Sequence, residues 1–210
     1  MNRLWAGLKG RGYETLLRAG LVRYRRPFTS FTEQIWDDGY ARGEHDHYER
    51  LPELGRYSVI AGYLGFGPGP SDILEIGCGA GILRNRIPDD LVRSYDGYDT
   101  GPHAIAQARA RHHKRSRYHV GPAPQGQTFD VILCNEVLYL IPDFEAVIEQ
   151  LAGLLRPEGR LITSNTRYHG DFVLRDALAR HFALLDETVV INVAERKKWR
   201  VGYYKGKTRP

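Results

Sequence analysis

The chain has 210 residues, of which 42% are hydrophobic, and this is enough for one α/β domain with a sizeable core. The net charge of +5 weakly favours an anionic partner, although solvated arginine-rich helices produce the same charge. Two cysteines make no disulfide framework, and no apolar run approaches the ~20 residues that span a bilayer. The first residues lack the apolar centre of a signal peptide, so we expect a soluble cytoplasmic protein.

The first third of the chain is expected to be helical. Residues 1–64 are predicted to form an N-terminal extension, and residues 65–210 the core of the same domain. The stretch Leu51–Leu64 has apolar residues at helical spacing, and one face is predicted to hold Leu54, Tyr57, Ile60, Ala61 and Leu64. The glycines and prolines of GFGPGPS (65–71) predict the end of this helix.

A polar cluster with two histidines precedes that helix. His45 and His47 flank Asp46, a spacing that could present two metal ligands from a strand, but no third ligand follows at a recognisable distance. A role as a general base or hydrogen-bond partner near a substrate pocket and a plain exposed loop are both open. The aromatic residues Trp36 and Tyr40 lie just before this cluster.

The stretch Asp72–Ile82 reads DILEIGCGAGI and is the most informative part of the chain. Its apolar run is typical of a buried parallel strand, and glycines follow at alternate positions, Gly77, Gly79 and Gly81. Such glycines permit a tight turn whose backbone approaches a ligand closely. A helix over Ala80–Ile87 is predicted to point its free N–H groups at that ligand.

Strands and helices alternate after the glycines, which predicts a mostly parallel sheet with helices on both faces. The further strands are expected at Ser94–Asp99, Arg117–Val120, Phe129–Cys134, Arg156–Asn165, Ala183–Val193 and Trp199–Lys205. Helices are expected at Pro102–Lys114, 144–155 and 170–182. Asp99 lies 22 residues after Gly77, where a carboxylate accepts hydrogen bonds from ribose hydroxyls, and Asn135 and Glu136 follow the fourth strand.

The glycine pattern distinguishes two nucleotide-binding fingerprints. Gly-x-Gly-x-x-Gly would require glycine at Ile82, whereas Gly-x-Gly-x-Gly preceded by Glu75 resembles motif I of class I S-adenosylmethionine-dependent methyltransferases. The resemblance covers about residues 51–165 and includes Asp99, the FDVILCNEVL segment and the LRPEGRL turn. The phrase NEVLYL is also similar to small-molecule methyltransferases of the NodS-like group.

The resemblance implies a doubly wound, Rossmann-like α/β sheet of seven mostly parallel strands in the order 3-2-1-4-5-7-6. It implies S-adenosylmethionine as cofactor, S-adenosylhomocysteine as product, and a lid formed by the N-terminal helices. The implied cofactor-binding residues are Glu75, Gly77, Cys78, Gly79, Gly81, Asp99, Thr100 and Asn135, with Arg56 and Tyr57 as candidates for the cofactor carboxylate. The acid that often binds adenine is missing from GPAPQGQ (121–127).

Methyl transfer mainly requires positioning, and a hydroxyl acceptor also requires a base. The candidate bases are Glu136, His45 and His169, and the candidate acceptor contacts are Trp36, Tyr40, His47 and Tyr139. We expect transfer to oxygen or nitrogen of a small sugar-derived or secondary-metabolite acceptor, without a metal, by a monomer or homodimer that binds neither nucleic acid nor membrane. The alternatives are an RNA methyltransferase and a non-catalytic, cofactor-binding regulatory or partner protein.

Overall fold

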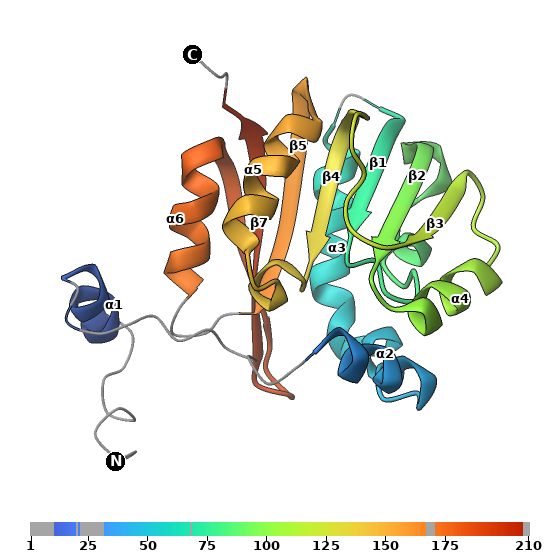
Figure 1. Ribbon diagram of the computed structural model, residues 1–210, viewed down its shortest axis with the longest axis horizontal. Helices are drawn as coiled ribbons and strands as arrows, with labels where there is room; N and C mark the ends of the chain where they lie inside the picture. The colour runs from blue at the N-terminus through green and yellow to red at the C-terminus, as the bar shows by residue number, and fades with distance from the viewer. Residues whose placement is uncertain (1–10, 20, 22–31, 68, 167–170, 208–210) are drawn as a thin grey trace.

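Seven strands form one sheet in the order β3-β2-β1-β4-β5-β7-β6 in the computed structural model, as the resemblance implies (Figure 1). The structure describes residues 11–19, 21, 32–67, 69–166 and 171–207. The strands are β1 (Ser71–Ile76), β2 (Val92–Asp99), β3 (Ser116–Val120), β4 (Phe129–Asn135), β5 (Leu155–Thr166), β6 (Phe182–Asn192) and β7 (Lys197–Gly206). β7 is antiparallel to both of its neighbours and forms a hairpin with β6, so the two strands predicted last in the chain are confirmed.

Helices cover both faces of the sheet, as Figure 1 shows. The α-helices are α1 (Arg11–Arg18), α2 (Glu33–Ala41), α3 (Leu51–Gly65), α4 (Pro102–Ala110), α5 (Phe144–Leu154) and α6 (Asp171–His181). One core cluster joins α3 and α4 to the sheet, and a second joins α5 and α6 to the opposite face. Ile73 and Leu74 on β1 are both fully buried, because a parallel strand inside such a sheet is covered on both faces.

Helix α3 contributes one apolar edge to the first cluster through Tyr57, Ile60 and Leu64. The prediction that Leu54 shares this buried face is wrong, since its side chain is 38% exposed. The inward positions of the first helical turns are instead taken by Glu53 and Arg56, which are almost completely buried. A hydrophobicity pattern cannot find this face, because charged residues occupy it.

The predicted helix over Ala80–Ile87 is also wrong. Turns follow the glycines, and the only regular element there is a short 3₁₀ helix at Arg84–Arg86. Gly79 and Gly81 have φ angles of +51° and +71°, which a right-handed helix cannot contain. The loop therefore presents no helix dipole to a ligand.

Helix α4 ends at Ala110, four residues before the predicted end at Lys114. His112 and Arg115 have positive φ angles of 51° and 57°, and these left-handed residues stop the helix and turn the chain into β3. The remaining predicted strands and helices differ from the observed bounds by three residues or fewer.

Cys78 and Cys134 are both free and buried, as expected for small core residues. In the described part of the chain, no helix is long and apolar enough to cross a membrane. Of the predicted N-terminal extension, residues 1–10, 20 and 22–31 lie outside the described residues.

The core packing makes a direct stability prediction. Ile132 on β4 is completely buried in the second cluster, so Ile132→Ala should lower the free energy of unfolding by about 2–5 kcal/mol. Ile191 on β6 is 53% exposed, so the same substitution there should change it by less than about 0.5 kcal/mol. Urea unfolding of both variants measures the difference, and equal losses would contradict this packing.

Candidate active site

The glycine loop follows β1 at the edge of the sheet where the parallel strands end. The N–H groups of Gly77 and Cys78 both donate to the carbonyl of Tyr98, at 2.8 and 3.1 Å, which ties the loop to the end of β2. A side chain at Gly77 would collide with Val137, and one at Gly79 with the hydroxyl of Tyr40. Both glycines also have positive φ, so space and backbone conformation each require glycine.

Asp99 joins this loop to the segment after β2. Its Oδ2 accepts a hydrogen bond from the N–H of Gly79 and its Oδ1 from that of Gly101, both at 2.9 Å. Burial raises the pKa of this carboxyl group, while the two N–H donors lower it. A carboxylate has about four acceptor positions, so each oxygen can accept a further donor. Thr100, the next residue, is exposed.

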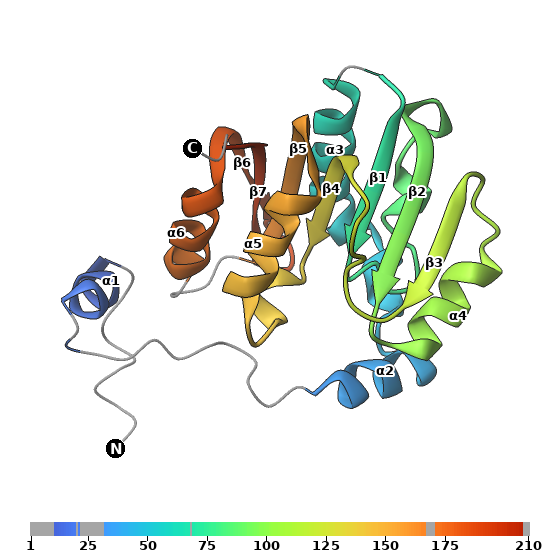
Figure 2. The same ribbon diagram turned by 45° about the horizontal axis from the view of Figure 1, so that its top comes forward.

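Helix α2 lies across the ends of these loops, beside α4, in both views (Figures 1 and 2). Asp37 accepts hydrogen bonds from the backbone N–H and from Nδ1 of His103, at 2.8 and 2.7 Å. Helix α4 has no side-chain cap of its own at Gly101, so α2 supplies it. Gln107 also donates to the carbonyl of Tyr40 at 2.9 Å. The ring of Tyr40 is thereby held over Gly79.

Glu75 lies beneath the loop and is 1% exposed. Its carboxyl group accepts a hydrogen bond from the hydroxyl of Tyr95. Burial, followed by the charge of Asp99, raises its pKa well above the usual range. Burial also raises the pKa of the Cys78 thiol, so this cysteine has little thiolate character. These two side chains support the loop from the core side.

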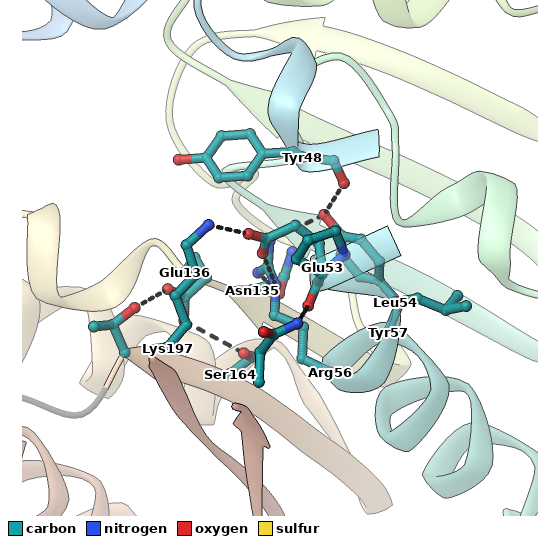
Figure 3. Close-up of polar contacts among 12 residues, drawn as sticks. Tyr48, Glu53, Leu54, Arg56, Tyr57, Asn135, Glu136, Ser164 and Lys197 are labelled. Carbon is teal, nitrogen blue, oxygen red and sulfur yellow. Dashed lines mark hydrogen bonds and ion pairs between the residues drawn. The ribbon is translucent and has the colours of Figure 1, made fainter. Parts of the chain in front are cut away.

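A buried guanidinium connects α3 to the end of β4, as Figure 3 shows. Arg56 donates to Glu53 at 2.9 Å, to Asn135 Oδ1 at 2.6 Å and to the hydroxyl of Tyr57 at 3.0 Å. Lys197 from β7 forms a second ion pair with Glu53, at 2.7 Å. The guanidinium also lies near three aromatic rings, with 4.5–5.7 Å to the centroids, and these belong to Tyr48, Tyr57 and Trp199.

Glu136 follows Asn135 and has a φ of +58°, which is unusual for a residue with a side chain. Its N–H donates to the carbonyl of Ser164 at 2.8 Å. Its carboxylate accepts hydrogen bonds from Tyr139 at 3.0 Å, from the Ser164 hydroxyl at 3.3 Å and from Thr166. Burial raises the pKa of Glu136, against the opposing effects of Arg56 and these hydroxyls.

Sequence reasoning missed Ser164 and Thr166 as contacts of Glu136. They alternate at the end of β5, so their side chains lie on the same face of the strand. The pattern Ser-x-Thr at the carboxyl end of a strand next to β4 was the available signal. It is weak, because such residues also occur in ordinary strands.

The two histidines before α3 lie in an aromatic cluster. His45 stacks against Trp36 and Tyr48, with ring centroids 5.0 and 5.8 Å away, and its Nε2 bonds the carbonyl of Trp36 at 3.1 Å. Since a carbonyl only accepts, we assign the proton to Nε2. Burial lowers the pKa of His45. His47 Nδ1 bonds the carbonyl of Glu44 at 2.8 Å.

In the part of the chain that the structure describes, the ring of His45 contacts those of Trp36, His47 and Tyr48, whereas the carboxylate of Glu136 bonds to Tyr139, Ser164 and Thr166. His169 lies outside the described residues. Within the described ranges, no group of three His, Cys, Asp or Glu side chains is arranged to hold a metal ion.

The model of a family described as "Methyltransferase domain" matches residues 45–200. A curated relative, ubiquinone biosynthesis O-methyltransferase from Nitrosospira multiformis, is 25% identical over 155 residues, which cover 70% of this chain and 58% of the relative. The chain thus spans just over half the length of that protein, and 53% and 66% of the next two curated relatives.

Two solved structures share the fold. The N-methyltransferase NodS from Bradyrhizobium japonicum, in complex with S-adenosylhomocysteine, is 16% identical with a TM-score of 0.70, covering 81% of this chain and 98% of that one. The 1,6-didemethyltoxoflavin N1-methyltransferase from Burkholderia thailandensis is 20% identical with a TM-score of 0.68, covering 93% and 89%. The chain therefore belongs to the methyltransferase-domain family and has the fold of class I S-adenosylmethionine-dependent methyltransferases.

Proposed function

We propose that this protein transfers the methyl group of S-adenosylmethionine to an oxygen or nitrogen of a small-molecule acceptor, with Glu136 as the general base. The arrangement of Glu136 carries this proposal. Its carboxylate is held by three hydroxyl groups beside the predicted cofactor loops, on a backbone conformation that costs on the order of 1–3 kcal/mol. Strain of this size persists at a site where the exact placement of a group matters.

The residues of the crevice fit this cofactor. The carboxylate of Asp99 has acceptor positions left for the two ribose hydroxyls, and the glycines keep the loop free of side chains. Thr100 would lie near the adenine. Asn135 would contact the methionine part, since Arg56 holds its Oδ1 and thereby orients its amide group. When bound, the cofactor supplies an activated methyl group on a sulfonium.

Arg56 and Tyr57 remain our candidates for the carboxylate of the methionine part. Arg56 uses one hydrogen from each of its three nitrogens in the observed contacts, and a guanidinium has five N–H donors. Two donors are thus left for an anion. Glu53 and Lys197 balance one another beside it, so the network can accept a further negative charge.

Glu136 would remove the proton from the acceptor as the methyl group is transferred. A base works best when its pKa lies near the working pH, and burial moves the pKa of this carboxyl group in that direction. Tyr139 donates to the same carboxylate and would line the acceptor pocket. We add Tyr48 to that pocket, because its ring lies next to the Arg56 guanidinium (Figure 3).

The predicted roles of the other aromatic residues change. Tyr40 was expected to contact the acceptor, but its hydroxyl lies against Gly79, so we propose that it contacts the cofactor. Nε2 of His45 and Nδ1 of His47 each form a hydrogen bond with a backbone carbonyl. We propose that these histidines, with Trp36, shape the turn between α2 and α3.

Small acceptors are supported by the similar proteins, which include a ubiquinone-biosynthesis O-methyltransferase and a 1,6-didemethyltoxoflavin N1-methyltransferase. Their named reactions occur at oxygen in the first case and at nitrogen in the second. The experiment that tests the proposal is therefore a panel of phenols, primary and secondary amines and nitrogen heterocycles, incubated with methyl-labelled cofactor. Labelled product from one class supports the proposal, and turnover of RNA alone would contradict it.

Cofactor binding can be tested without an acceptor. Asp99→Ala should weaken the binding of S-adenosylhomocysteine at least about tenfold, or about 1.4 kcal/mol, because both ribose hydroxyls lose their acceptor. Asp90→Ala removes an exposed carboxylate elsewhere and should leave the affinity unchanged. Calorimetric titration measures both, with thermal unfolding as a check that each variant is folded. Equal affinities for the two variants would remove Asp99 from the site.

The role of α2 as a lid gives a second test. Asp37→Asn removes the negative charge that caps α4, so binding of S-adenosylhomocysteine should weaken about threefold or more, with a stability loss of about 1 kcal/mol. Asp38→Asn is the matched control, because it changes the neighbouring carboxylate, which accepts a hydrogen bond from Gln34. A loss of stability in Asp37→Asn without any loss of affinity would contradict the lid.

The base is tested by the dependence of turnover on pH. Since protonated Glu136 cannot accept a proton, kcat should fall as the pH decreases through its raised pKa. Glu136→Gln should lower kcat by about 100-fold or more and abolish this acidic limb.

Ser164→Ala is the matched control for that test. It removes one hydroxyl donor from the carboxylate, so the pKa of Glu136 should rise and the acidic limb should move to higher pH with most activity retained. An acidic limb that is identical in the wild type and Glu136→Gln would assign the base to another residue.

A further inference from the structure

A second concave site is lined by none of the residues proposed for methyl transfer. It is a cleft of about 580 Å³ where the end of α4 meets the edge strand β3. Its lining residues are Arg109, His112, His113, Ser116, Arg117, Tyr118 and His119. Pockets for small ligands have volumes of about 300–1,000 Å³, so this cleft has room for one.

The segment that borders the cleft carries an excess of positive charge. Residues 109–117 contain five arginines or lysines and no acidic residue, and two of these cations, Arg109 and Arg117, line the cleft. Arg117 pairs with Asp96, which also contacts His119, whereas Arg109 donates to a backbone carbonyl. Beside the cleft, Arg111 pairs with Glu49. The positive charges thus exceed their carboxylate partners, and an anion would be attracted to this edge of the sheet.

Two guanidinium groups in the cleft are held in place before any ligand binds. Arg109 donates through Nε and Nη2 to the carbonyl of Tyr118, at 3.1 and 2.7 Å, and so covers a backbone acceptor on the free edge of β3. Arg117 donates through Nε and Nη2 to the two oxygens of buried Asp96, at 2.8 and 2.7 Å. Each group keeps the hydrogens of Nη1, and a fixed side chain loses little entropy when it binds an anion.

The floor of the cleft is also rigid. Tyr118 is buried, and its hydroxyl contacts Nδ1 of His113 at 2.5 Å, while Nε2 of His113 contacts Asn85 at 2.5 Å. Burial lowers the pKa of His113, and the nearby charges of Arg84 and Arg111 lower it further. The lowered pKa favours the neutral form of His113, so the positive charge of the cleft comes from its arginines.

We propose that this cleft binds a phosphate group of a phosphorylated small molecule, with Arg109 and Arg117 as its main ligands. Planar guanidinium groups with paired donors match the oxygens of phosphate in geometry and charge. His112, exposed at the start of the turn, would close the site. A phosphodiester of nucleic acid has the same chemistry, so the experiment must distinguish the two sources.

Calorimetric titration of the full chain with pyrophosphate, at low ionic strength, tests the site. Arg109→Gln should weaken binding about tenfold, the effect of losing one charge-assisted hydrogen bond. Arg180→Gln removes an equal charge from an exposed side chain on α6, a helix that does not line the cleft. It should change the affinity for pyrophosphate less than about twofold. No binding by the wild type, or an equal loss in both variants, would overturn the proposal.

A twelve-nucleotide single-stranded oligonucleotide provides the second arm. If it displaces pyrophosphate from the wild type and fails to bind Arg109→Gln, nucleic acid is the source of the phosphate; if it does not displace pyrophosphate, the source is a small molecule. The Asp99→Ala variant separates this site from the proposed function. It should bind pyrophosphate normally although it has lost S-adenosylhomocysteine, whereas loss of pyrophosphate binding in this variant would contradict an independent site.

Discussion

The hydrogen bonds of the Asp99 carboxylate are the constraint on which the cofactor crevice depends. They join the loop after β1 to the segment after β2, through the N–H groups of Gly79 and Gly101. In the proposed function the same carboxylate would hold the ribose, so the group that organises the crevice would also bind its ligand. Helix α2 adds further contacts to the same two segments. Asp37 bonds to the start of α4 after β2, and Tyr40 lies against Gly79 in the loop after β1. If α2 acts as the proposed lid, its closure and the order of the two loops would depend on the same contacts.

The other half of the crevice is built around buried charge. Removing Arg56 and Glu53 from water is costly, and their mutual contact repays this only because Asn135 and Lys197 satisfy further donors and acceptors. The arrangement gives Glu136 a neighbouring positive charge that opposes the effect of burial on its pKa. Hydrophobic residues of the same size would pack as well, but they would place no charge beside Glu136. This favours a functional reason for the network over a structural one.

The sequence predicted most of the fold because its signals were local and strong. Buried apolar runs mark the strands. The place of Asp99 at the end of the second strand could be predicted from its distance along the sequence from Gly77 alone. The prediction of a helix over Ala80–Ile87 was wrong, because glycine is compatible with both a helix start and a left-handed turn. Packing decides between the two conformations. The contacts of Ser164 and Thr166 with Glu136 depend on the register of β4 and β5, which no local pattern specifies.

The cationic cleft and the cofactor loop meet at Tyr118. Its hydroxyl would lie 3.0 Å from a Cβ at Gly81, so the floor of the cleft packs against the back of the loop. Contact alone does not couple two sites, since coupling requires an element with two arrangements that both ligands bias. Tyr118 is buried and bonded to His113, and the two arginines are held by β3 and Asp96, so these contacts favour a single arrangement of the shared wall. The packing therefore favours two sites that share a wall and bind their ligands independently.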